Sequence, residues 1–101
     1  MNTKRGGFVY IITNQNNTVL YTGVTSELRV GIFEHKTKFY PKRFTARYNC
    51  NKIVWFEFLP HIEEAIEREK QIKAGNRKAK EFLINSTNTT WKDLWDEIQD
   101  L

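Results

Sequence analysis

The stretch FVYIITNQNNTVLYTGV, residues 8–24, decides how this chain folds. Its first six residues, 8–13, are β-branched and aromatic and carry apolar side chains on both faces, which is typical of a buried strand. The NQNN that follows is a run of turn formers, and TVLYTGV at 18–24 has the composition of a second strand. Four polar residues between two strands predict a β-hairpin.

A third strand is predicted at residues 52–59, KIVWFEFL, which are apolar on both faces apart from Glu57. The strand at 8–13 has the fewest polar positions, so we place it in the centre of the sheet. The expected strand order is therefore 2-1-3. The fold class follows as α+β, a small three-stranded antiparallel sheet flanked by helices.

Two helices are predicted on either side of the third strand. The residues TSE at 25–27 resemble a helix cap with an acidic first turn, and the helix they open is expected to run to about residue 38. Pro60 is acceptable in the first turn of a second helix, at about 61–74. Both helices carry apolar stripes that can cover the sheet.

The chain after residue 74 predicts two further helices. Gly75 and Asn76 break the preceding helix, and a short basic helix of about 77–84 follows them. Near the C-terminus, apolar residues recur at the spacing of one helical face. This spacing predicts an amphipathic helix at 91–101 that docks on the core through Trp91, Leu94, Trp95 and Ile98.

Length and composition predict one cytoplasmic globular domain, residues 1–101. Hydrophobic residues are 40% of the chain and charged residues of both signs are 28%, which argues against disorder. No apolar run approaches the ~20 residues of a membrane span, and no apolar signal region follows MNTKRGG. The single cysteine, Cys50, excludes an internal disulfide and a CxxC zinc site, and we interpret it as a small residue at the entry to a strand.

The basic residues gather in two stretches that contain no acidic residue, from 35 to 56 and from 70 to 80. The first stretch is interleaved with Phe39, Tyr40, Phe44 and Tyr48, as in surfaces that bind nucleic acid. A solvated face without a partner is the alternative. The residues we expect to contact nucleic acid are Lys36, Lys38, Lys42, Arg43, Arg47, Arg77 and Lys78.

One carboxylate breaks the pattern of its helix. Glu69 stands at i+7 from Ile62 and at i+3 from Ile66, on the inward face of the helix at 61–74. A partly buried carboxylate is costly unless a cation or hydrogen bonds compensate it. Glu69 is therefore either half of an ion pair or a ligand of a metal ion.

Other unusual positions accompany it. His35 shares an apolar helix face with Leu28 and Ile32, where it is either a hydrogen-bonded core side chain or a functional one. Gly31 lies one turn earlier, and a glycine within a helix costs about 1 kcal/mol against alanine. Two tyrosines, Tyr10 and Tyr21, sit in the strands of the predicted hairpin.

Taken together, these residues resemble the GIY-YIG nuclease superfamily. FVY at 8–10 and YTG at 21–23 stand where the family carries its two name motifs. EHK at 34–36 places His35 where the family often has a histidine, and REKQIK at 68–73 places Glu69 at the family's metal-binding glutamate. The likeness covers residues 8–98 and is closest to small standalone bacterial members, which are related to the N-terminal nuclease domain of an excinuclease.

The resemblance implies a GIY-YIG-like fold and metal-dependent hydrolysis of DNA phosphodiesters, in a setting such as DNA repair. It implies that Tyr10, Tyr21 and His35 are catalytic and that Glu69 holds one Mg²⁺ or Mn²⁺ ion. The tyrosine hydroxyls, His35 and Glu69 should then share one concave surface. DNA is the implied partner, bound largely without regard to sequence.

One position departs from the family. Gly31 stands where an arginine normally contacts the scissile phosphate. Loss of such a contact commonly costs about 10²–10³ in rate, so we expect low activity. The alternative is a module derived from such a nuclease that binds nucleic acid without cutting it.

Overall fold

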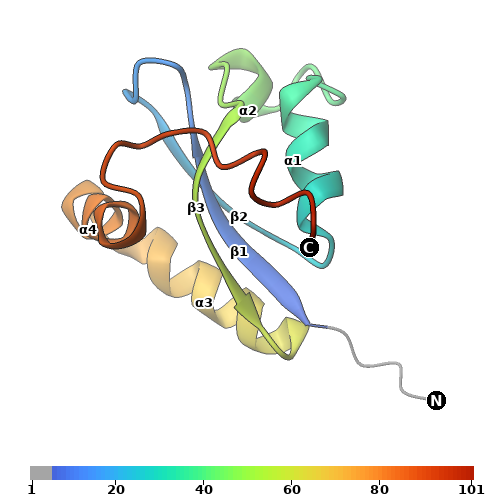
Figure 1. Cartoon of the computed structure of the whole chain (residues 1–101), viewed down its shortest axis with the longest axis vertical. Coiled ribbons are helices and arrows are strands. Elements are labelled where there is room, and N and C mark those ends of the chain that lie inside the picture. Colours follow the sequence, from blue (N-terminus) through green and yellow to red (C-terminus); the bar gives the residue numbers. More distant parts are fainter. Residues whose placement is uncertain (1–5) are drawn as a thin grey trace.

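A computed structural model of the protein describes residues 6–101 (Figure 1). The stretch MNTKR, in which the sequence predicts no targeting signal, lies outside the described residues. The elements follow one another as β1 (Gly7–Thr13), β2 (Leu20–Thr25), α1 (Leu28–Lys36), α2 (Phe44–Arg47), β3 (Lys52–Leu59), α3 (Ile62–Ala74) and α4 (Arg77–Thr87).

The three strands form one antiparallel sheet in the order β2-β1-β3, which confirms the predicted fold class and strand order. In the pairing of β1 with β2, Tyr10 lies opposite Gly23 and Ile12 lies opposite Tyr21. The turn formers close the hairpin as expected, because the Asn14 side-chain oxygen accepts hydrogen bonds from the backbone N–H groups of residues 18 and 19.

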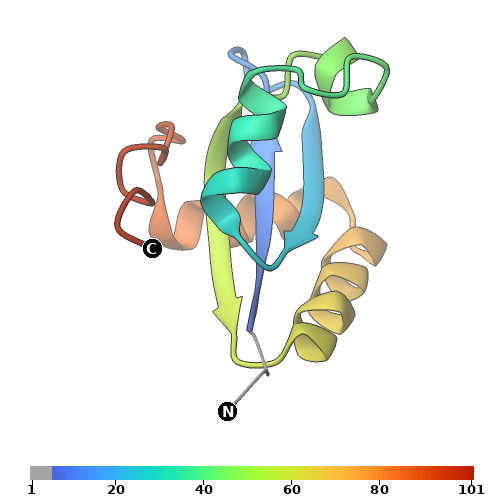
Figure 2. The same ribbon diagram turned by 90° about the vertical axis from the view of Figure 1, so that its right-hand side faces the viewer.

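Alternation along β1 divides the core into two layers. Val9 and Ile11 are fully buried in a cluster with residues of α3 and α4. Tyr10 and Ile12 point to the other face and pack in a cluster with residues of α1. Figures 1 and 2 show α1 and α2 on one side of the sheet and α3 and α4 on the other. The central strand thus presents Tyr10 to α1.

The prediction of a C-terminal helix at 91–101 is wrong. Trp91 has a left-handed φ of 56°, and the chain beyond it forms turns. The Leu94 N–H donates to the Ile53 carbonyl over 2.8 Å, and the Ile53 N–H donates to Asp93 Oδ1 over 3.2 Å. Because β3 is an edge strand with free backbone groups, residues 93 and 94 bond to the edge of β3, and the residues after them form only isolated turns with backbone bonds such as Ile98 N–H to the Leu94 carbonyl.

The apolar spacing of that segment nevertheless indicated its packing. Ile98 is fully buried, and Leu94 and Trp95 pack against the cluster that contains Tyr10. Trp91 packs against the opposite cluster. The stripe therefore docks on the core as expected, but in a series of turns.

The remaining differences concern helix bounds. The four-residue α2 was not predicted, α4 runs three residues beyond the expected end at 84, and α1 ends two residues before the expected 38. Cys50 is fully buried just before β3, and burial raises the pKa of its thiol. Within residues 6–101, no helix is long and apolar enough to cross a membrane.

Candidate active site

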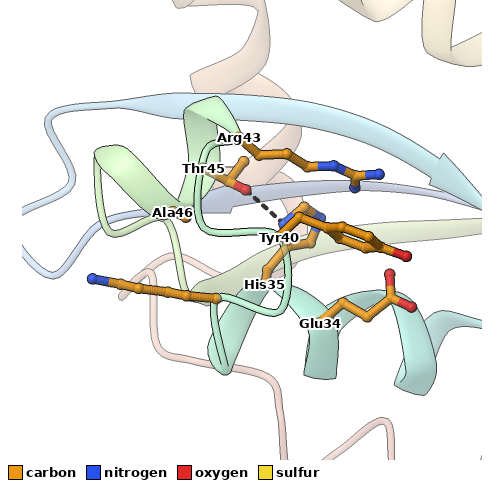
Figure 3. Close-up of a pocket in the computed structure, with 7 residues that line it drawn as sticks. Glu34, His35, Tyr40, Arg43, Thr45 and Ala46 are labelled. Atoms are coloured by element: carbon orange, nitrogen blue, oxygen red, sulfur yellow. Dashed lines mark hydrogen bonds between the residues drawn. The ribbon is translucent and has the colours of Figure 1, made fainter.

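The centre of the site is a buried hydrogen-bonded pair of side chains from β1 and α1. Tyr10 Oη lies 2.8 Å from His35 Nε2. His35 Nδ1 lies 2.8 Å from Thr45 Oγ1, the contact that is dashed in Figure 3. His35 is only 7% exposed, so its hydrogen-bonding capacity is met by these two hydroxyls. The buried, satisfied histidine considered from the sequence is thus present, and its partner is the tyrosine of the first motif.

The charges around this pair fix which groups carry protons. Burial, reinforced by the nearby Tyr21, raises the pKa of Tyr10, so the phenol is neutral and can donate to Nε2. Burial, and after it the positive charge of Arg43, lowers the pKa of His35 from 6.5 to about 4. The imidazole is therefore neutral at pH 7, with Nε2 free to accept from Tyr10 and Nδ1–H placed to donate to Thr45.

Gly23, on β2, is required by the position of Tyr10. A Cβ on Gly23 would overlap Cζ and the hydroxyl of Tyr10. The phenol therefore lies directly over the backbone of its cross-strand partner. This contact gives a physical reason for a glycine at the end of the second motif.

Tyr21 extends the site to the open edge of the sheet. Its ring centroid is 5.8 Å from that of His35, so the imidazole is flanked by both tyrosine rings, with Tyr10 at 5.7 Å. On another side, the ammonium group of Lys73 lies 5.5 Å from the Tyr21 ring centroid. Tyr21 thus connects the β1–α1 pair to side chains of α3.

Glu69 reaches this edge from α3. Its Oε2 lies 2.8 Å from Lys73 Nζ, and the Glu69 side chain is only 13% exposed. The same Lys73 ammonium group contacts both the Glu69 carboxylate and the Tyr21 ring, so the carboxylate lies close to that ring. The negative charge of Glu69 also contributes to the raised pKa of Tyr10. The sequence-predicted residues Tyr10, Tyr21, His35 and Glu69 are therefore brought together in the structure.

The donor set suits a hard divalent cation held by a single protein oxygen ligand. Within residues 6–101, no three His, Cys, Asp or Glu side chains are grouped as they would be around a metal ion. Mg²⁺ tolerates such sparse ligation because it keeps several waters and uses substrate phosphate oxygens. The hydrogen bond to Glu69 raises the pKa of Lys73, so an ammonium group neutralises the carboxylate in this state. A metal ion at Glu69 would have to share or displace that contact.

Arg43 is a site residue whose place the sequence did not reveal. It lines a small hollow together with Glu34, His35, Tyr40 and Thr45, and its guanidinium carbon lies 4.1 Å from the Tyr40 ring centroid. Figure 3 shows the Arg43 and Tyr40 side chains extending alongside one another past His35. Because Arg43 lies in a loop without periodicity, no pattern in the sequence directs its side chain toward His35.

Gly31 leaves α1 without a cation toward the site. It lies in the turn before His35, and a Cβ there would come within 3.3 Å of the Thr25 side chain. Arg29 of the same helix is exposed to solvent. The guanidinium of Arg43 is the positive charge that acts to lower the pKa of both Tyr10 and His35.

The predicted nucleic-acid contacts fall into two groups. Lys36 donates to Asp93 Oδ2 over 2.6 Å, and Arg77 bonds to Glu81 and to two carbonyls of the β1–β2 turn, so both tie the fold together. Lys38 donates to the Asn49 side chain over 2.6 Å. The other four predicted contacts are exposed and form neither an ion pair nor a side-chain hydrogen bond with any residue in 6–101: Lys42, Arg43, Arg47 and Lys78.

A β2-β1-β3 sheet that joins two strand tyrosines to a helical histidine and a helical glutamate defines a small domain of the GIY-YIG type. The chain belongs to this family: the GIY-YIG catalytic domain matches residues 6–82. Members that are nucleases act on DNA and generally use a divalent metal ion.

Two proteins illustrate the relationship. A UPF0213 protein of Syntrophus aciditrophicus (strain SB) is 32% identical over 77 residues, which cover 76% of this chain and 87% of that protein. The solution NMR structure of a UPF0213 protein from Bacillus halodurans superposes with a TM-score of 0.55 at 24% identity, covering 87% of this chain and 92% of the other. The first supports membership of a group of small standalone proteins, and the second supports the shared fold.

Proposed function

We propose that this chain is a single GIY-YIG-like domain that hydrolyses DNA phosphodiesters slowly, with help from one Mg²⁺ or Mn²⁺ ion and with little regard to sequence. The observation that carries the proposal is the continuous contact from Tyr10 through His35 and Tyr21 to Lys73 and Glu69. These side chains come from four different elements, and no requirement of core packing places a hydroxyl, an imidazole and a carboxylate on one edge.

In the proposed reaction a water oxygen attacks the phosphorus, the bond from phosphorus to the leaving sugar oxygen breaks, and the leaving oxygen takes a proton from solvent water. Tyr10 receives the proton of the attacking water while it passes its own proton to His35 Nε2, 2.8 Å away. A preformed phenolate is not required, which suits the raised pKa of Tyr10. Thr45 holds the imidazole in the orientation that this transfer needs.

The phosphate itself favours this proton transfer. Arg43 contributes to the low pKa of His35, and a phosphate bound at its guanidinium would offset that positive charge. Burial is the larger cause of the low His35 pKa, so the imidazole stays neutral in the free protein. Offsetting the charge of Arg43 would raise that pKa and make Nε2 a better proton acceptor. His35 is therefore best able to accept a proton when a phosphodiester is bound.

Glu69 would hold the metal ion. Such an ion, when bound, stabilises negative charge on the phosphate and on the leaving oxygen. Until then Lys73 pairs with the Glu69 carboxylate and holds it near the Tyr21 ring. With Gly31 at the family's arginine position, Arg43 supplies the guanidinium whose charge acts on Tyr10 and His35, and the missing contact underlies the low activity that we propose.

The test is nicking of supercoiled plasmid with Mg²⁺ or Mn²⁺ present, compared with the same reaction in EDTA. Glu69→Gln keeps the shape of the side chain but removes its charge, and we expect it to abolish the metal-dependent nicking. Glu67→Gln is the matched control, because Glu67 is an exposed residue of the same helix. The control should nick as the parent does.

One result would overturn the nuclease proposal. If the folded parent binds DNA but nicks no faster with metal than in EDTA, the chain is a binding module. The glycine at position 31 and the Lys73–Glu69 ion pair would then explain why it does not cut. Equal nicking by the parent and Glu69→Gln would instead show that Glu69 is not the metal ligand.

A further inference from the structure

A face of exposed aromatic rings lies beside the candidate active site. We name it the aromatic face and define it as Phe39, Tyr40, Phe44 and Tyr48, together with the guanidinium groups of Arg43 and Arg47. The four rings are 63%, 42%, 47% and 45% exposed, in that order. Large rings left half in water contribute little to the core, so packing alone does not account for them.

The rings of the aromatic face form two contacting pairs. Phe44 and Tyr48 have centroids 4.6 Å apart, and Phe39 and Tyr40 have centroids 4.9 Å apart. The face is continuous with the candidate site, because Phe44 is stacked on Tyr21 at 6.2 Å with an interplanar angle of 28°. Figure 2 shows α2, which carries Phe44, beside the start of β2.

The charges on this face select the chemistry of its ligand. Arg43 lies over the Tyr40 ring at 4.1 Å and Arg47 lies 5.9 Å from the Tyr48 ring centroid. No acidic residue occurs between residues 35 and 56, and neither arginine forms an ion pair with a described residue. Rings that alternate with unpaired cations fit a polyanion whose repeating units also have flat faces.

We propose that the aromatic face stacks the unpaired bases of a single-stranded DNA segment, whose phosphates Arg43 and Arg47 contact, directly beside the candidate active site. The ligand is taken as DNA on the strength of the proposed function. A paired base offers its face only to its neighbours in the duplex, so stacking on protein rings selects unpaired bases. The preferred substrate of the site is then DNA with a single-stranded segment next to the scissile bond.

The experiment separates bases from phosphates. Binding is followed by fluorescence anisotropy in EDTA, so that no cleavage occurs, with three labelled probes of about 15 nucleotides, the upper end of common single-strand site sizes. The probes are oligo-dT, an abasic strand with the same number of phosphates, and a duplex. The parent should bind oligo-dT at least about tenfold more tightly than the abasic strand.

Two double variants test the rings without changing the charge. Phe44→Ala with Tyr48→Ala should bind oligo-dT at least about tenfold more weakly than the parent, with the same dependence on salt, and bind the abasic strand as the parent does. Phe44→Leu with Tyr48→Leu keeps apolar contacts and should show the same loss, which makes the result independent of any defect in folding. Phe82→Ala, which removes a 75% exposed ring on α4, is the matched control and should leave all affinities unchanged.

Equal binding of oligo-dT and the abasic strand by the parent would overturn the proposal. Retention of the oligo-dT preference by both folded double variants would overturn it as well. Because the measurement uses EDTA, it is independent of catalysis. Glu69→Gln should keep the oligo-dT preference, so a protein that stacks bases but does not nick plasmid would retain this inference and lose only the proposed activity.

Discussion

Acidification should destabilise this protein through His35. The imidazole is neutral in the folded state with a pKa of about 4, whereas an unfolded histidine has a pKa of 6.5. Between these two values the unfolded chain binds a proton that the folded chain does not. The free energy of unfolding is therefore complete above pH 6.5 and falls as the pH is lowered toward 4.

The size of the effect follows from the two pKa values. Each unit of difference corresponds to about 1.4 kcal/mol, so the slope below pH 6.5 is about 1.4 kcal/mol per pH unit. Between pH 6.5 and pH 4.5 the loss from His35 alone is about 2–3 kcal/mol. His35 is only 7% exposed, so solvent does not screen most of this penalty.

The assay is urea denaturation followed by tryptophan fluorescence at several pH values between 7.5 and 4.5. His35→Gln removes the titrating group, and its unfolding free energy should change by less than about 1 kcal/mol over the range in which the parent loses 2–3. At pH 7.5 the variant should be less stable than the parent by about 1–3 kcal/mol, because the hydroxyls of Tyr10 and Thr45 lose a well-placed partner.

The other histidine provides the control. His61 is exposed, and His61→Gln should keep the slope of the parent. A parent whose stability is flat between pH 6.5 and pH 4.5 would refute the buried, neutral His35. So would a His61→Gln variant that loses the slope, since the titration would then belong to the surface.

Three further predictions concern glycines and charge. Gly23→Ala should destabilise the fold by about 1–3 kcal/mol, because the new Cβ displaces the Tyr10 phenol. Gly75→Ala is the control and should not destabilise it, because its Cβ meets only ordinary contacts. Equal melting temperatures for the two variants would contradict the predicted clash between a Cβ at position 23 and Tyr10. Gly31→Arg should increase metal-dependent nicking by up to about 10²-fold, and the new side chain requires a small shift of Thr25. In single-turnover measurements this gain should disappear when Glu69→Gln is also present. Replacing Lys42, Arg43 and Arg47 with alanine should flatten the plot of log affinity for duplex DNA against log salt by about two to three units; an unchanged slope would leave these residues as a solvated surface.

The sequence was sufficient for the sheet because its signals are local and mutually consistent. Continuous apolar runs, a turn of four polar residues and the low polarity of residues 8–13 together determined the strands and their order. It failed at residues 91–101 because helical spacing records which side chains are buried. The spacing says nothing about whether the backbone bonds to itself or to a neighbouring strand edge.

The candidate site divides in the same way. His35 and Glu69 were found because each interrupts an apolar helix face, whereas Tyr10 and Tyr21 gained their meaning only from the resemblance to the family motifs. The structure joins all four. The sequence did not predict that Arg43 lies near His35. It also did not predict that Lys36 pairs with Asp93 instead of being free to contact nucleic acid. Both depend on the path of loops that link residues far apart in the chain, and those paths have no periodicity.

The bonds between the C-terminal segment and β3 set an order of events during synthesis. The side chains of the candidate site all come from residues 10–73, and the pairing of all three strands is complete at residue 59. The Lys36–Asp93 contact spans 57 positions and the Ile53–Asp93 bond spans 40. On the ribosome, the residues that bond to the outer edge of β3 therefore emerge after all of those that supply the candidate site.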